Sequence, residues 1–350
     1  MRRAAVLAEY EQPLDLRELD SVEPEPDGIV VETEACGICR SDWHAWKGHW
    51  PSIPTNHVLG HEPAGTVLAV GNEVEKFQVG DEVGIPFNLA CGHCKTCWSG
   101  ESHLCDDGLS LGFTADAPGA FASEFAIPRA DFNAVHLPDG MTTVEMAALG
   151  CRFATSFHAL VHKADVSGGD WLAVHGCGGV GLSVINIGSA LSATVIAIDL
   201  DENALNLAEQ VGADVCVNAS KVDDVPKTVT DVTDRGADIS VDALGIAETC
   251  QNSLSSLSPQ GQHIQVGMTT ADEAGEIALP VDSMVDTELE FIGVKGMPPQ
   301  RYDEIFRMIA ADNLSPADLV TNRVDIGAVS DRLSSMDEYD TLGVEVITSF

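Results

Sequence analysis

Cys39, His61 and Cys151 are the residues whose types suggest shared chemistry, because thiolate sulfur and imidazole nitrogen are ligands that zinc prefers. Three protein ligands leave a fourth position on the metal open for water or substrate, as in a catalytic zinc site. A chain with 10 Cys and 11 His offers many such triples, so the set is weak evidence alone. The neighbouring motifs are what favour a catalytic zinc.

A second group of cysteines lies close together in the sequence, at residues Cys91, Cys94, Cys97 and Cys105. Four thiolates at this spacing predict a closed tetrahedral site, a structural zinc lobe over residues 91–105. An iron–sulfur cluster uses similar spacing and is the alternative. Because four cysteines satisfy the metal, this lobe would carry no chemistry and would stabilise a loop with little core of its own.

A glycine-rich loop has the sequence Gly176-Cys177-Gly178-Gly179-Val180-Gly181. It follows an apolar strand and precedes a helix expected over residues 182–191, and this context predicts a dinucleotide-binding site. Gly176 permits the tight turn, Gly178 lets the backbone approach the pyrophosphate, and Gly181 allows close packing of helix on strand. The helix N-terminus favours the pyrophosphate anion. Asp199 lies 18 residues after Gly181, where a carboxylate binds the adenosine ribose and repels a 2′-phosphate. NAD is therefore expected, with NADP as the alternative.

The stretch around the first proposed ligand carries a resemblance to a known family. It reads Cys36-Gly37-Ile38-Cys39-Arg40-Ser41-Asp42-Trp43-His44, and Gly60-His61-Glu62 follows. This pattern resembles the zinc-dependent medium-chain dehydrogenases, the alcohol dehydrogenase superfamily. The resemblance extends over essentially the whole chain and implies that Cys39, not Cys36, is the ligand. A redox dithiol formed by Cys36 and Cys39 is the alternative.

The resemblance implies a role for each polar residue of this stretch. Ser41 would contact the alcohol oxygen, and His44 would end a proton relay running from Ser41 through the nicotinamide ribose. Such a relay is needed because the proton of the alcohol must leave before hydride can. Asp42 would orient His61, as a carboxylate often does for a metal-bound histidine. Glu62 resembles the family glutamate that lies behind the metal.

Further contacts to cofactor and substrate are expected. Arg40 would meet the pyrophosphate, and it is the main side-chain candidate, because Val344 follows Gly343 where some family members have a basic residue. The nicotinamide would lie at the ends of successive strands, where ligands of open α/β sheets bind, and would be bordered by Leu244, Val266 and Val294. Val180 resembles the family residue that packs behind the nicotinamide ring.

The aromatic side chains near the proposed zinc predict the substrate class. Trp46 and Trp50 resemble residues that narrow the pocket in tetrameric microbial alcohol dehydrogenases, and Phe87 falls where the family often places a pocket aromatic. These residues favour small apolar alcohols and their aldehydes. A polyol, threonine or glutathione-adduct dehydrogenase is the alternative within the family, and a non-catalytic nucleotide-binding zinc protein is the alternative outside it.

The elements that position these residues suggest an α/β protein with two domains. Residues 1–35 alternate apolar and polar side chains and predict strands, and a helix is expected from Thr143 to about Leu160 with Thr143 as N-cap. Beyond residue 170, strands and helices alternate, which predicts a doubly wound parallel Rossmann sheet. The resemblance implies a catalytic domain with a distorted barrel at 1–153 and 294–350, and a dinucleotide-binding domain at 154–293.

Composition restricts the partners. The 350 residues include 55 acidic and 18 basic residues, and the formal net charge of −37 disfavours binding to nucleic acid or anionic membranes. We see no leader sequence and no long apolar run, so a cytoplasmic enzyme is expected. The acids are dispersed and only seven residues are lysine, which favours a halophilic source over an ordinary acidic enzyme. The resemblance implies a homotetramer or homodimer.

Overall fold

The computed structural model describes residues 1–270, 272–339 and 341–350. The chain divides into two compact units. The first unit contains Met1–Ala154, Gly296–Arg307 and Val320–Phe350, and the second contains Thr155–Lys295 and Met308–Leu319. The predicted domain division stays a prediction; it assigns residues 308–319 to the catalytic domain, whereas they group here with the second unit.

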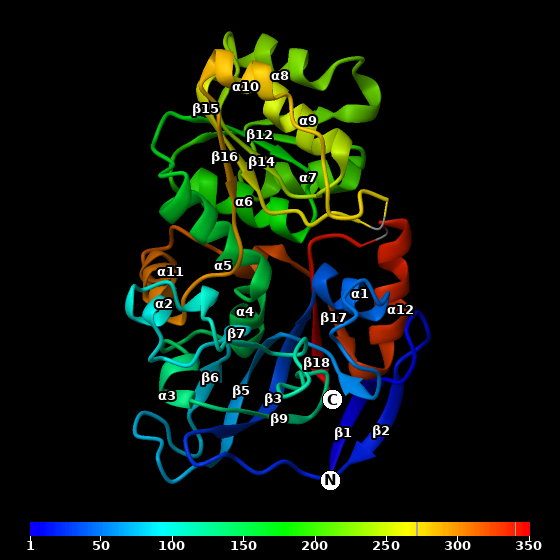
Figure 1. Ribbon diagram of the computed structural model, residues 1–350, viewed down its shortest axis with the longest axis vertical. Helices are drawn as coiled ribbons and strands as arrows, with labels where there is room; N and C mark the ends of the chain where they lie inside the picture. The colour runs from blue at the N-terminus through cyan, green and yellow to red at the C-terminus, as the bar shows by residue number, and fades with distance from the viewer. Residues whose placement is uncertain (271, 340) are drawn as a thin grey trace. The chain divides into compact units, whose positions relative to one another are not determined.

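The first unit is built mainly from antiparallel strands (Figure 1). Its largest sheet has the order β10-β6-β5-β3-β18-β17, and β9 also pairs with β3. These strands are β3 (Ile29–Ile38), β5 (Glu62–Val70), β6 (Glu82–Gly84), β9 (Glu124–Ile127), β10 (Val135–His136), β17 (Val320–Asp325) and β18 (Val344–Ser349). Two smaller sheets contain β1 (Arg2–Leu7), β2 (Asp15–Leu19) and β4 (His57–Val58), and β7 (Asn88–Leu89) with β8 (Leu109–Ser110).

The pairing of β3 with β5 brings two predicted site segments together. Gly37 lies opposite Glu62 in this antiparallel pair, so the end of β3 meets the start of β5. Cys39 directly follows β3 and forms the N-cap of α1 (Arg40–Trp46), whereas His61 directly precedes β5. The register of one strand pair therefore places residues that are 22 positions apart side by side.

Helices α2 (Lys95–Trp98), α3 (Ala130–Asn133), α4 (Thr143–Ala148), α11 (Tyr302–Ala310) and α12 (Val329–Ser335) complete this part of the chain. The single helix expected from Thr143 to Leu160 is wrong. Thr142 is the N-cap, in a capping box with Glu145; α4 ends at Ala148, and α5 (Cys151–Phe157) begins after Gly150. A Cβ built on Gly150 would lie 2.5 Å from Glu62 Cβ, so close packing against β5 requires a glycine there.

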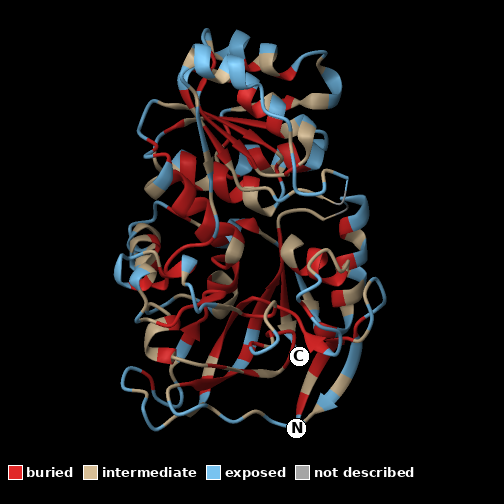
Figure 2. Ribbon diagram, in the orientation of Figure 1, coloured by how far each residue is buried: buried red, intermediate tan, exposed pale blue. Residues whose placement is uncertain are grey.

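The second unit is a doubly wound parallel sheet with the order β13-β12-β11-β14-β15-β16, as the sequence pattern predicts. Its strands are β11 (Trp171–His175), β12 (Thr194–Asp199), β13 (Val215–Asn218), β14 (Ala237–Asp242), β15 (Leu257–Gln265) and β16 (Glu290–Gly293). Its helices are α6 (Gly179–Ala190), α7 (Glu202–Gln210), α8 (Val225–Thr233), α9 (Ala247–Ser255) and α10 (Val281–Thr287). The inner strands are buried, whereas α10 has no buried residue (Figure 2).

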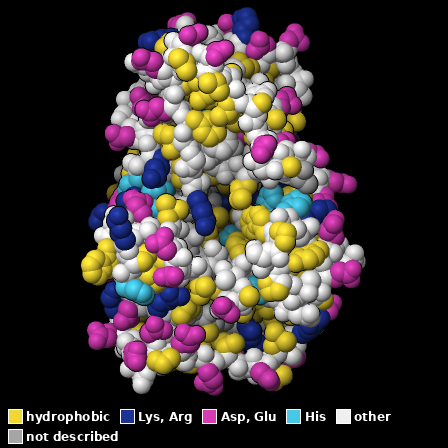
Figure 3. Space-filling model, in the orientation of Figure 1, with side chains coloured by type: hydrophobic (Ala, Val, Ile, Leu, Met, Phe, Trp, Pro, Cys, Tyr) yellow, Lys and Arg dark blue, Asp and Glu magenta, His cyan; other side chains and the backbone are white. Residues whose placement is uncertain are grey.

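Acidic side chains are spread over the surface face shown in Figure 3 rather than gathered at one place. This agrees with the dispersed acids of the sequence and the formal net charge of −37. Within residues 1–270, 272–339 and 341–350, no helix has the length and apolar character needed to cross a membrane.

Candidate active site and metal centres

The first unit gathers Cys39, His61, Glu62 and Cys151 into one buried group. The ligand atoms of these four residues all lie within 4.8 Å of one another. Cys39 comes from the start of α1, His61 and Glu62 from the start of β5, and Cys151 from the first position of α5. The fold thus brings together the three residues that were predicted to share a zinc.

Asp42 holds this group in place through hydrogen bonds. Its Oδ1 accepts from His61 Nδ1 at 2.9 Å and from the backbone N–H of Gly60 at 3.1 Å. Its Oδ2 accepts from the backbone N–H of Cys39 at 3.0 Å. A carboxylate that keeps the proton on Nδ1 leaves the lone pair of Nε2 available for a metal. The buried Nε2 of His61 has no hydrogen-bond partner among the described residues.

The surroundings of His61 and Cys39 suit a bound cation. Burial acts to lower the pKa of His61, but the Asp42 carboxylate outweighs it and the pKa is raised well above its ordinary value. A hydrogen bond from Cys151 lowers the pKa of Cys39, against the effect of burial. The negative charges of Asp42 and Cys39 therefore favour a positive charge among these side chains, which a metal ion can supply in place of a proton, and two sulfurs with one nitrogen fit zinc.

Arg152 is a site residue that the sequence reasoning missed. Its guanidinium forms an ion pair with Glu62, with Nε donating to Oε1 at 3.2 Å and Nη2 donating to Oε2, and both side chains are buried. Burial acts to lower the pKa of Arg152, but the Glu62 carboxylate raises it above its ordinary value, whereas burial raises the pKa of Glu62 against the opposing effect of Arg152. The signal that could have identified Arg152 is a lone arginine, directly after Cys151, in an otherwise apolar helix.

Ser41 and His44 both lie on α1, three positions apart, and therefore share a face of the helix. The ring of His44 is buried and stacks on Trp50, with ring centroids 5.5 Å apart and an interplanar angle of 14°. Burial, together with the nearby His49 and Arg40, lowers the pKa of His44 to about 4. His44 is consequently neutral near physiological pH and able to accept a proton.

Aromatic rings surround His61. Phe87 meets the His61 ring edge-on at 5.7 Å, and Phe113, which the sequence reasoning missed, lies 4.5 Å from it. Trp50 packs edge-to-face on Phe113 at 5.2 Å. Trp46 is instead a buried core residue whose indole N–H donates to Gln12 O at 2.7 Å.

Arg40 is held between two aromatic rings. Its guanidinium carbon lies 4.1 Å from the ring centroid of Trp43 and 4.4 Å from that of Tyr339, and Nη1 donates to Met336 O at 2.8 Å. Burial lowers the pKa of Arg40, and the nearby Tyr339 and Asp337 oppose this effect. The guanidinium is thus fixed in orientation, and its role toward a pyrophosphate stays a prediction.

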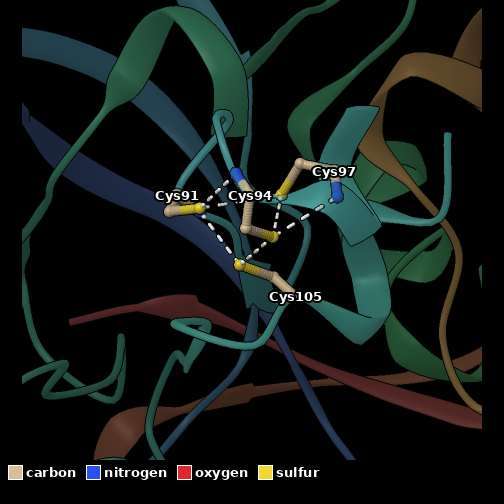
Figure 4. A group of neighbouring side chains, drawn as sticks. All are labelled: Cys91, Cys94, Cys97 and Cys105. Carbon is tan, nitrogen blue, oxygen red and sulfur yellow. Dashed lines mark hydrogen bonds between the residues drawn. The ribbon is translucent and has the colours of Figure 1, made fainter. Parts of the chain in front are cut away.

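The four cysteines of the predicted structural lobe point toward one another (Figure 4). Sulfur atoms of Cys94 and Cys97 are 3.5 Å apart, and those of Cys94 and Cys105 are 3.8 Å apart. Backbone N–H groups donate to the sulfurs of Cys91, Cys94 and Cys105. Backbone N–H donation from Cys97 and Asp106 lowers the pKa of Cys94 to about 6, which favours the thiolate form that binds metals. Four inward thiols fit a structural zinc.

The dinucleotide loop of the second unit has the geometry that its glycines suggest. Gly176 adopts φ +94°, and Gly178 is the N-cap of α6, which begins at Gly179 and includes Val180 in its first turn. A Cβ built on Gly181 would lie 1.8 Å from Gly176 O, so only glycine fits where helix meets turn. The first turn of α6 thus presents free N–H groups to an anion.

Asp199 ends β12 beside this loop. Its carboxylate accepts from the backbone N–H of Cys177 at 2.6 Å and from that of Asp201 at 2.9 Å. Leu244, Val266 and Val294 directly follow the adjacent parallel strands β14, β15 and β16, after a one-residue gap in the case of Leu244. The residues predicted to border the nicotinamide therefore share the carboxyl edge of the sheet, where ligands of such sheets bind.

Comparison with known proteins agrees with this arrangement. Residues 25–139 match the family model of the alcohol dehydrogenase GroES-like domain, and residues 179–311 match that of the zinc-binding dehydrogenases. An alcohol dehydrogenase of Geobacillus stearothermophilus is 33% identical over 299 residues, which cover 84% of this chain and 83% of that protein. The chain belongs to the zinc-dependent medium-chain alcohol dehydrogenase family.

Other relatives match this chain over nearly its full length. The NAD-dependent alcohol dehydrogenase of Saccharolobus solfataricus is 29% identical over 99% of both chains. The solved structure of the alcohol dehydrogenase from Thermus sp. ATN1 superposes with a TM-score of 0.89 at 27% identity, covering 99% of this chain and 100% of that one. Family membership and the inward donor groups together make zinc the metal that this chain holds.

Proposed function

We propose that this protein is a zinc-dependent alcohol dehydrogenase that reversibly oxidises primary or secondary alcohols to aldehydes or ketones, with NAD as hydride acceptor. The observation that carries the proposal is the convergence of Cys39, His61 and Cys151 around the unpartnered Nε2 of His61. A purely structural site would instead be closed by a fourth protein ligand, as at Cys91, Cys94, Cys97 and Cys105, whereas the nearby Glu62 carboxylate is paired with Arg152.

Cys39, His61 and Cys151 would hold the catalytic zinc. When bound, zinc supplies a Lewis acid that lowers the pKa of an alcohol hydroxyl. Asp42 keeps the Nδ1 proton on His61 and so directs its Nε2 lone pair inward. Arg152 forms an ion pair with Glu62 and so fixes this carboxyl group beside the ligands.

Ser41 and His44 would remove the proton of the alcohol. Ser41 would accept a hydrogen bond from the alcohol and His44 would take up its proton, with a ribose hydroxyl of bound NAD as the link between them that the family resemblance implies. The low pKa of His44 keeps its imidazole neutral and ready to accept, and also makes His44 a poor place to keep a proton. A proton that reaches His44 must therefore leave it again quickly.

The proposed cofactor is NAD, which accepts hydride at its nicotinamide ring. The first turn of α6 would bind the pyrophosphate, and Asp199 would accept from the adenosine ribose hydroxyls and repel a 2′-phosphate. Relatives named NAD-dependent alcohol dehydrogenase support this choice. Arg40, fixed between Trp43 and Tyr339, is proposed as a further pyrophosphate partner.

The proposed substrates are small apolar alcohols. Phe87 and Phe113 offer apolar ring surface next to His61, and Trp50 packs on Phe113, whereas a polyol would need several hydrogen-bond partners there. Trp46 is the weaker pocket candidate, because its ring belongs to the core and its N–H is bonded to Gln12.

The proposal is tested by following the absorbance of reduced nicotinamide in concentrated KCl, with alcohols from ethanol to benzyl alcohol and with NAD and NADP in parallel. We expect turnover that a chelator abolishes and that added zinc restores. We also expect a higher kcat/KM for NAD than for NADP. Absence of turnover with every alcohol, on protein whose zinc sites are shown to be filled, would contradict it. Turnover of polyols alone would favour the alternative within the family.

We also propose that the protein forms a homodimer or homotetramer through the second unit. The edge strand β16 leaves one side unpaired within the described sheet, and Phe291 on it is 39% exposed. Val281 and Val285 of the neighbouring α10 are exposed as well. An open sheet edge beside apolar side chains is suited to pairing with a second copy.

The acidic surface supports a halophilic source as a further proposal, since concentrated salt screens the repulsion between like charges. A cytoplasmic location is proposed because thiols arranged for metal binding are typical of a reducing compartment. Light scattering and thermal unfolding across a KCl series would test assembly and salt dependence together. We expect an oligomer whose unfolding temperature rises with KCl. A monomer at all salt concentrations would refute the assembly, and full stability without salt would refute the halophilic origin.

A further inference from the structure

His49 lies against His44 at the end of α1. The Nδ1 atoms of the two imidazoles are 2.9 Å apart, within hydrogen-bond distance, and their ring centroids are 5.1 Å apart. The backbone N–H of His49 donates to His44 O at 3.0 Å, and Gly48 adopts φ +73°. The left-handed glycine turns the chain back, so that His49 reaches the preceding helical turn.

Two tryptophan rings fix this pair. Trp43 meets His44 edge-on at 4.9 Å and His49 edge-on at 5.2 Å. The second ring, Trp50, stacks on His44. His44 is only 6% exposed, whereas His49 is partly open to solvent. One imidazole of the pair is therefore buried and the other is in reach of water.

We propose that His49 is a second histidine of the proton relay, which takes the proton from His44 and releases it to water. The proposal rests on the proposed function, in which His44 is the acceptor of the alcohol's proton. In this role His49 acts through His44, which its imidazole contacts, so it is a positioning and proton-transfer residue rather than a catalytic one.

The contact between two Nδ1 atoms defines the steps. A hydrogen bond there needs one Nδ1 with a proton and one without, and His44 as donor leaves its own Nε2 free to accept. When a proton arrives at His44 Nε2, the Nδ1 proton of His44 moves to His49 Nδ1, and His49 then loses its Nε2 proton to water. Each N–H bond broken is matched by one formed, and no electrons are transferred.

The starting tautomers are restored in the reverse direction of the reaction, when His49 Nε2 takes a proton from water, the Nδ1 proton of His49 returns to His44 Nδ1, and His44 gives up its Nε2 proton toward the substrate. The low pKa of His44 has physical causes in this setting, namely burial first and then the nearby charges of His49 and Arg40, opposed by Cys39. Lys47 and Asp337 are the other charged groups near Trp43, with Lys47 Nζ 6.0 Å from its ring centroid and Asp337 accepting from its indole N–H. A buried site that cannot hold a proton and an adjacent imidazole that water can reach together form an exit path.

The test compares His49→Asn with His136→Asn, a matched change at an exposed histidine of β10 that is remote from the relay. An amide can form a hydrogen bond but cannot pass a proton on. We expect His49→Asn to lower kcat for alcohol oxidation by about tenfold near neutral pH, with the loss shrinking at higher pH and reversed by added imidazole. His136→Asn should behave like the unchanged protein, and both variants should keep the unfolding temperature.

A second readout does not depend on turnover. Nitrogen NMR of the histidine side chains should show His44 held in one tautomer in the unchanged protein and a mixture of tautomers in His49→Asn. Equal losses at every pH, without rescue by imidazole, would show that His49 only packs against His44 and would overturn the proposal. If the unchanged protein oxidises no alcohol, the proposed function fails, whereas a His44 tautomer that does not respond to His49→Asn refutes the pair itself.

Discussion

Replacing Cys39 with serine is expected to lower kcat/KM for alcohol oxidation by at least about 10³-fold, because a lost Lewis acid is worth several kcal/mol and each 1.36 kcal/mol is a factor of ten. A serine hydroxyl does not ionise near neutral pH, so the site loses one of its two thiolates and its hold on zinc. Metal analysis should show the loss of one zinc ion per chain, while the closed site at Cys91, Cys94, Cys97 and Cys105 keeps its own.

Cys36→Ser is the matched control for this change. Cys36 lies three positions before Cys39 and is just as buried, but it is not among the residues whose ligand atoms converge. Burial raises the pKa of Cys36 well above its ordinary value, so this thiol stays protonated. Cys36→Ser should therefore retain zinc and most of the activity. Equal loss of zinc in both variants would contradict the assignment of Cys39 as the ligand, and retention of zinc in Cys39→Ser would do so directly.

The convergence of Cys39 and His61 was predictable from sequence because each lies in a short motif of metal-binding residue types, whereas Cys151 lies in a helix and was assigned only in the company of the other two. Asp42, one helical turn from Cys39, also fell within such a motif, and the structure places its carboxylate on His61. Arg152 did not, since nothing local indicates that the Glu62 carboxylate needs a buried partner. The need arises only when β5 and α5 meet, which is a tertiary event.

The contact between β5 and α5 also explains why the prediction of a single helix over residues 143–160 was wrong. The stretch from Thr143 to Leu160 is periodic enough to predict one helix, but Gly150 interrupts it where Glu62 packs. Helix α10 was not predicted from the sequence. It buries none of its residues and therefore shows no apolar stripe in the sequence. The alternating strands and helices of the second unit were easier to predict from the sequence, because parallel inner strands are buried on both faces and need continuous apolar runs.

Replacing Cys97 with serine is expected to lower the stability of the folded chain and to leave alcohol turnover largely unchanged. The cluster around this lobe contains three buried residues, Ala90, Cys91 and Cys97, with Cys94, Cys105 and Phe132 partly buried against them. So few apolar groups cannot offset the entropy of ordering residues 91–105. Binding of zinc must then supply the difference, as it does in small zinc-stabilised folds where metal binding is worth about 10 kcal/mol or more.

Cys97→Ser should lose the zinc ion that Cys39→Ser keeps, and its unfolding temperature should fall by at least several degrees, since ~1 kcal/mol shifts it by about 2–4 °C in a domain of about 150–250 residues and the bound zinc contributes more than that. Backbone hydrogen exchange should rise within 91–105 first, while turnover measured at low temperature persists. Cys216→Ser, at an exposed free cysteine of the second unit, is the control and should change neither zinc content nor stability. If both variants unfolded at the same temperature, the lobe would owe its order to packing alone, which a core of three buried residues makes physically difficult.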